Sequence, residues 1–196
     1  MKQIVWRLLF VPALLLVAVS CQRSIRAGLG LDALFGVQDT TRHPSVKLDT
    51  LVAAPFKVLS VQFEVYTDRE IGQRLNAGYV LLCNYINDRR LVTKRVMAFY
   101  YTYDEPYLVE AAIEVDSLPV VLDSIITART IRGGKLLIAH YKGPYEQMVM
   151  AYRAIDRWLA DHHKVASELP FEVYLNDLMT VKSRFDLLTD VYQFYQ

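Results

Sequence analysis

The stretch GGKLLIAHYKGPYEQMVMAYRAIDRWLADHHKVASELPFEVYLND, residues 133–177, decides the fold. Residues 136–141 form a short apolar run that predicts a strand. After Gly143-Pro144, apolar residues recur at intervals of three and four, which predicts a helix over residues 144–163. Residues 170–175 then alternate in character, which predicts a second strand.

The second predicted strand places a carboxylate beside a phenol. Successive strand side chains point to opposite faces, so Glu172 and Tyr174 share one face, and Phe171 and Val173 take the other. This pair is the first feature of the stretch that could carry chemistry.

The same order of elements is predicted upstream. Residues 56–65 alternate like a half-buried strand, and residues 69–88 carry a helical apolar stripe. The other predicted strands cover residues 96–103, 107–115, 125–131 and 189–195. Strand, helix, strand, strand therefore occurs twice. We expect an α+β fold of two pseudo-symmetric βαββ halves, with a mainly antiparallel sheet, two long helices on one face and a central ligand cleft.

The N-terminus predicts export. Lys2 and Arg7 flank an apolar run over residues 8–19 that is too short to span a bilayer. Cys21 follows small residues and resembles the lipidated cysteine of a bacterial lipobox, although an ordinary signal peptide is an alternative. We expect a signal peptide at 1–20, a lipidated tether at 21–54 and a folded domain at 55–196. Because Gln22 follows the cysteine, the resemblance favours the periplasmic face of the outer membrane over the inner membrane.

Charge and cysteine content argue against nucleic acid as a partner and against a disulfide within the chain. Without residues 1–20 the chain keeps 20 basic and 21 acidic residues, which gives no electrostatic footprint for nucleic acid. With Cys21 lipidated, only Cys83 remains, so no disulfide can form within the chain. We expect neither a metal site nor a cofactor, since the chain has no cluster of ligating residues in a known metal-binding spacing.

The chain resembles the GyrI-like small-molecule-binding domain, which also serves as the effector-binding half of AraC- and MerR-type regulators. The resemblance rests on HYKGPY at residues 140–145, FEVYLND at 171–177 and TDVY at 189–192. Leu178 departs from the proline usual after the Asn-Asp pair, and Asp190 replaces a glutamate. The likeness covers roughly residues 55–195.

The resemblance implies a cleft for flat, hydrophobic and often cationic molecules, in which the family's cleft carboxylate corresponds to Glu172. The candidate ligand-binding residues are Glu172, Tyr174, Tyr101, Glu110, Tyr141 and Tyr145. A carboxylate set among aromatic rings is poorly solvated, so its pKa should rise unless a cation compensates. Glu172 could therefore attract a cation or act as a general base.

Three functions stay open on the sequence. The first is a membrane-tethered protein that binds amphipathic small molecules. The second is a hydrolase with Glu172 as its catalytic residue, since some members of the family open cyclopropane-bearing compounds. The third is a protein-interaction module.

The lipoprotein hypothesis makes a direct prediction. The mature chain should begin at Cys21 and partition into membranes, because two or three acyl chains anchor stably where one does not. Replacing Cys21 by Ser should release the protein or leave the precursor uncleaved. Cell fractionation and gel migration measure this, and a variant identical to wild type in both would contradict the hypothesis.

Overall fold

The computed structural model describes residues 42–102, 104–176 and 179–196 and has the predicted α+β character. Its elements in chain order are β1 (Ser45–Ala53), β2 (Phe56–Val65), α1 (Asp68–Asp88), β3 (Thr93–Tyr100), β4 (Tyr107–Val115), β5 (Thr127–Ile131), β6 (Gly134–Lys142), the 3-10 turn η2 (Tyr145–Gln147), α2 (Val149–Asp161), β7 (Phe171–Tyr174), the 3-10 turn η3 (Arg184–Asp186) and β8 (Leu188–Phe194). The eight strands form one sheet in the order β1-β6-β8-β7-β3-β4-β2-β5, and every pairing is antiparallel. The predicted sheet and both helices are confirmed.

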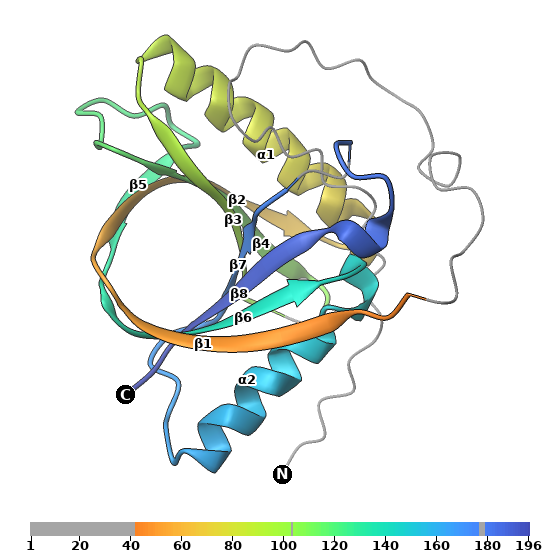
Figure 1. Cartoon of the computed structure of the whole chain (residues 1–196). Helices are drawn as coiled ribbons and strands as arrows, with labels where there is room; N and C mark the ends of the chain where they lie inside the picture. Colours follow the sequence, from red (N-terminus) through yellow and green to blue (C-terminus); the bar gives the residue numbers. More distant parts are fainter. Residues whose placement is uncertain (1–41, 103, 177–178) are drawn as a thin grey trace.

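The two helices pack on the same, outer face of a strongly curved sheet (Figure 1). The predicted stripe of α1 is buried along its whole length: Ile71, Leu75, Tyr79, Leu82 and Ile86. It packs over β2 and β4, where Gly78 lets the helix approach closely, since an added Cβ would lie 2.7 Å from that of Ala111. The shorter α2 packs over β6 and β1, with Ile155 and Leu159 buried. None of the helices in the described ranges is long and apolar enough to cross a membrane.

The inner face of the sheet carries its own apolar core. It contains side chains from seven of the eight strands or their ends: Phe56, Val58, Met97, Phe99, Ala112, Ile131, Leu136, Ile138, Phe171, Val173, Tyr192 and Phe194. β2 was predicted to be half-buried, yet Val58 and Ser60 on its second face are also fully buried. Alternating apolar residues predict that one face of a strand is buried. They do not predict whether the polar face of the same strand is covered as well.

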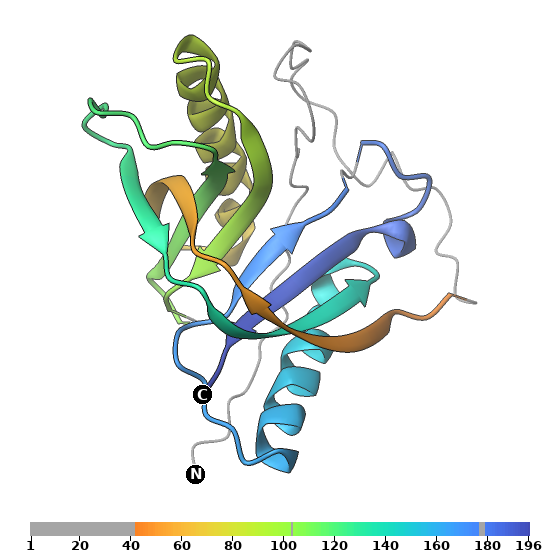
Figure 2. The same ribbon diagram turned by 60° about the vertical axis from the view of Figure 1, so that its left-hand side comes forward.

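One long ladder links the two ends of the sheet. β1 pairs with β6 and β2 pairs with β5, and β1 runs directly into β2 while β5 runs into β6 (Figure 2). Ala53 pairs with Gly134 and Phe56 with Ile131, so both strands keep one register through the junction.

β1 lies within the segment predicted as tether. Residues 45–53 were assigned there because the glycines, the polar cluster at 39–41 and Pro44 that precede them interrupt any sustained period. In the structure they form an edge strand whose residues are mostly exposed, with Val46 packed against the α2 cluster. The strand owes its place to pairing with β6, which is remote in sequence.

The centre of the sheet is the pairing of β3 with β7. Ala98 lies opposite Glu172 and Val96 lies opposite Tyr174. β7 is therefore held between β3 and β8, below the space between the two helices. The equivalence of the two halves and a ligand cleft between them stay predictions.

The close approach of the two long strands predicts that alanine substitution at two adjacent glycines has different effects on stability. A Cβ at Gly133 would lie 2.3 Å from the carbonyl oxygen of Ala53, whereas a Cβ at Gly134 would meet only a ring carbon of Phe194 at 3.7 Å. Gly133→Ala should lower the free energy of unfolding by ~1–3 kcal/mol, because backbone must move. The control Gly134→Ala should be neutral or stabilising by up to ~1 kcal/mol. Urea unfolding measures both, and equal effects would contradict the close approach.

Candidate functional site

Glu172 lies buried at the middle of the outer sheet face. Its neighbours across the ladder are Ala98 on β3 and Val191 on β8. These short side chains leave the glutamate side chain room to rise from the sheet. Only 7% of Glu172 is exposed.

Two tyrosines donate hydrogen bonds to the Glu172 carboxylate, one to each oxygen. The Tyr152 hydroxyl from α2 donates to Oε1 and the Tyr174 hydroxyl from β7 donates to Oε2, both at 2.8 Å. The prediction that Glu172 and Tyr174 share a face is therefore confirmed. Tyr100 from β3 extends the network, with its hydroxyl 3.3 Å from that of Tyr174. We call Glu172, Tyr152, Tyr174 and Tyr100 the Glu172 cluster.

Burial and hydrogen bonding act on Glu172 in opposite directions. Burial raises the pKa of the carboxyl, and the hydrogen bonds from Tyr174, Tyr152 and Tyr100 lower it. The net direction is upward from the ordinary value. Burial also raises the pKa of Tyr174 and Tyr100 well above the ordinary value, so both phenols keep their protons and remain donors.

Further aromatic side chains enclose the cluster. Tyr145 on η2 is partly buried and packs edge-on to Tyr174, with ring centroids 5.9 Å apart. Tyr79 on α1 is buried, and its hydroxyl donates to the carbonyl of Met97 at 2.9 Å. The arrangement is a single carboxylate under phenol rings, which suits an aromatic cation or a proton transfer.

Tyr141 has a local role in the structure. It is buried against α2, and its hydroxyl donates to the carbonyl of Pro144 at 2.7 Å. This bond closes the turn that leads from β6 into η2. Tyr141 thereby positions Tyr145, and its own hydroxyl bonds the turn instead of Glu172.

Tyr101 and Glu110 do not join Glu172. Tyr101 packs against the inner core, and Glu110 alternates with Val109 and Ala111 of the outer core, so both face inward. There Arg129 and Tyr101 donate to the Glu110 carboxylate, with the Arg129 Nη2 to Oε2 distance 2.8 Å. Although burial opposes it, these bonds hold the pKa of Glu110 below its ordinary value. A shared cleft of Glu110, Tyr101 and Glu172 is therefore wrong, because the sheet separates them.

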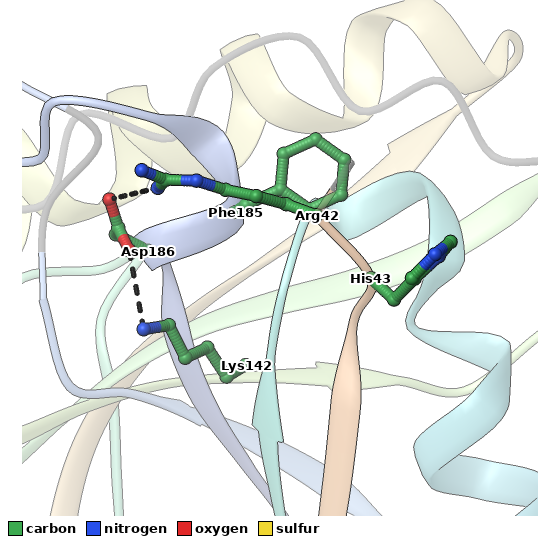
Figure 3. A pocket seen from close by; sticks show the side chains of 5 residues that line it. All are labelled: Arg42, His43, Lys142, Phe185 and Asp186. Carbon is green, nitrogen blue, oxygen red and sulfur yellow. Dashed lines mark hydrogen bonds and ion pairs between the residues drawn. The ribbon is translucent and has the colours of Figure 1, made fainter. Parts of the chain in front are cut away.

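A separate open pocket of 420 Å³ lies on the surface where the chain enters β1 (Figure 3). Arg42, His43, Lys142, Phe185 and Asp186 line it. Arg42 and Lys142 each reach Asp186 at 3.2 Å, so the two cations are already paired with a carboxylate. This pocket shares no lining residue with the Glu172 cluster.

Sequence reasoning did not select three residues near Glu172: Tyr152, Tyr100 and Tyr79. Tyr152 and Tyr79 belong to helical stripes that were assigned wholly to the core. Tyr100 follows from strand parity once β3 is known to pair with β7, because it lies on the opposite face from Tyr101. That pairing joins residues about 75 positions apart and leaves no local signal.

Solved structures with this fold come from proteins of low sequence identity. The C-terminal domain of EcmrR superposes with a TM-score of 0.59 at 16% identity, covering 78% of this chain and 98% of that domain. A Listeria innocua protein described as a hydrolase gives a TM-score of 0.58 at 11% identity, covering 76% of this chain and 92% of its own. In an EcmrR–DNA complex the match spans 57% of the regulator. At such identities these likenesses establish the fold alone.

The family is established by sequence. No curated protein matches the chain significantly. The model of the GyrI-like small molecule binding domain, however, matches residues 51–192, which include every strand from β2 to β7, both helices and most of β8. The chain therefore belongs to the GyrI-like small molecule binding domain family.

Proposed function

We propose that this protein binds an amphipathic aromatic cation, with Glu172 as the partner of its charge. One observation carries the proposal. Of the four buried acidic side chains, Glu110 pairs with Arg129, Glu114 with Arg95 and Asp190 with His140. Among the buried acidic side chains of the described ranges, Glu172 alone has no basic partner and is held by neutral phenols.

A cationic ligand would supply what the fold does not. Burying a carboxylate without a counter-charge is costly, and tyrosine hydroxyls offset only part of that cost. A cation at Glu172 would restore the charge balance and would lie against the rings of Tyr152, Tyr174 and Tyr145. Ring faces attract cations, so charge and aromatic surface favour the same class of ligand. The rings above Glu172 would have to part to admit it.

The same geometry favours hydrolysis as a second candidate. The raised pKa of Glu172 suits a general base, which would take a proton from an attacking water. Tyr174 keeps its proton, and its hydroxyl could protonate the leaving group or the ring carbon whose bond to the attacked carbon breaks. The substrate would then be an electrophilic compound, such as a strained cyclopropane.

We also propose that the binding domain acts at a membrane surface. The support is the sequence pattern before Cys21, which lies outside the described residues. The Cys21→Ser experiment tests this location independently of ligand binding.

Exchange of the Glu172 carboxylate for an amide separates the two functions. A charge-assisted contact is worth ~1.5–3 kcal/mol, so Glu172→Gln should weaken the naphthyltrimethylammonium ion by roughly tenfold to a hundredfold. Its uncharged isostere tert-butylnaphthalene should bind nearly as before. In a hydrolase the variant should lose turnover yet keep substrate binding. Calorimetric titration and product analysis measure these outcomes.

The matched control is Glu168→Gln, which removes one negative charge from an exposed position. It should leave both affinities unchanged, because an exposed charge is screened by water and salt. If Glu172→Gln behaves like Glu168→Gln in every assay, Glu172 is not the ligand's partner.

The pH dependence of binding follows from the raised pKa of Glu172. Below this pKa the carboxyl is neutral and attracts no cation, so affinity for naphthyltrimethylammonium should rise with pH through a window that begins near the ordinary value of 4.5. The ligand-free protein should respond in the opposite sense. Its folded state holds the proton more tightly than the unfolded chain, so the free energy of unfolding should fall as pH rises through that window. Relative to wild type, Glu172→Gln should remove both trends, and an unchanged pH profile in the variant would assign them to other groups.

A further inference from the structure

The buried polar side chains of the inner sheet face all have hydrogen-bond partners. Ser60 bonds Thr127 at 2.8 Å. Glu110, Glu114 and Asp190 have the basic partners given above. This face therefore meets the usual rule that buried polar groups are satisfied.

Two buried polar atoms break that rule within the described ranges: Thr189 Oγ1 and Asn76 Oδ1. Thr189 is fully buried, at 0% exposed. A buried hydroxyl or amide without a partner costs ~1–3 kcal/mol, so each such atom calls for an explanation.

Thr189 lies beside the Glu172 cluster. On β8 it is directly opposite Tyr174 of β7 and directly opposite Tyr141 of β6. Residues opposite one another in an antiparallel pair point to the same face. The Thr189 hydroxyl therefore rises from the outer face, next to the strand that carries Glu172. The nearby Tyr141 hydroxyl is already committed to Pro144.

Asn76 lies on α1, on the side of the helix that faces the centre of the sheet. It is three positions before Tyr79, so the two share one side of the helix. Tyr79 reaches the carbonyl of Met97 on β3, which places that side of α1 toward the centre of the sheet. Asn76 and Thr189 thus stand on the α1 and β8 sides of β7, where Glu172 lies between them.

We propose that Thr189 and Asn76 determine ligand specificity by accepting hydrogen bonds from N–H donors of the ligand. The inference rests on the proposed function and narrows its ligand class. The Asn76 amide oxygen can only accept, and the Thr189 hydroxyl can also accept. In this proposal a ligand bound at Glu172 would meet three acceptors: the carboxylate, the Thr189 hydroxyl and the Asn76 amide oxygen.

Three acceptors fit a cation that carries N–H groups. A protonated primary amine or an amidinium can donate to several acceptors at once, whereas a quaternary ammonium can donate to none. The preferred ligand is therefore an aromatic compound with a primary ammonium or amidinium group. A quaternary cation would gain the charge contact and leave both polar atoms unsatisfied.

The test uses two probes of equal charge and ring system, naphthylmethylammonium and its N,N,N-trimethyl derivative. Thr189→Val keeps the shape and removes the hydroxyl. In the full-length protein it should weaken the primary ammonium by roughly tenfold to a hundredfold, the range for one hydrogen bond to a charged group, and leave the trimethyl probe unchanged. Asn76→Leu should have the same selective effect, and Thr189→Ser should restore binding of the primary ammonium.

Unfolding of the ligand-free variants distinguishes a ligand contact from a structural one. Thr189→Val should be as stable as wild type or more stable, because it removes an unsatisfied buried hydroxyl. The control Thr127→Val, which loses the bond to Ser60 on the other face, should be less stable and bind both probes normally.

Each alternative outcome has one meaning. If Thr189→Val is less stable than wild type and binds both probes normally, the hydroxyl is satisfied by an internal water and the inference is overturned. If wild type binds the trimethyl probe as tightly as the primary ammonium, the inference also fails while the proposed function stands. If wild type binds neither probe, the proposed function fails and the inference fails with it.

Discussion

The ladder between the β1–β2 segment and the β5–β6 segment holds this sheet in its curved form. Because the two segments pair in one register across the junction, each end of the sheet is tied to the other through continuous chain. Gly133 permits the close crossing that this requires. The curvature divides the molecule into an inner core and an outer face that carries both helices. Glu172 is buried because its strand crosses the middle of that outer face.

The buried carboxylates show how the two faces differ. On the inner face, each buried acidic side chain has a basic side chain as its neighbour. On the outer face, Glu172 has only phenol donors, and burial raises its pKa. Thr189 and Asn76 add unsatisfied atoms to the same layer. Unpaired buried charges and unsatisfied polar atoms are expected mainly at functional sites, and in this protein both kinds lie on the outer face.

Local pattern located the principal elements. The stripe from Ile71 to Ile86 identified α1, and the alternation of Phe171, Glu172, Val173 and Tyr174 identified β7 with the correct residues on each face. Helix 144–163 was predicted as one unit, whereas the chain forms η2 and then α2 from Val149. The difference arises at the turn that Tyr141 and Pro144 close, where the first residues after the proline wind more tightly than an α-helix.

The sequence by itself determined the class of fold, because helical and strand periodicities are local properties of the chain. Its motifs at residues 140–145 and 171–177 indicated the family, and strand alternation placed Glu172 and Tyr174 on one face. Only the tertiary structure decided which residues surround Glu172. Strand pairing is non-local: it joined β7 to β3, brought Tyr100 to the carboxylate and sent Tyr101 and Glu110 to the opposite face. It also made a strand of residues 45–53, which had been predicted to belong to the tether. The partner of each buried charge depends on contacts between remote segments, and no local pattern records them.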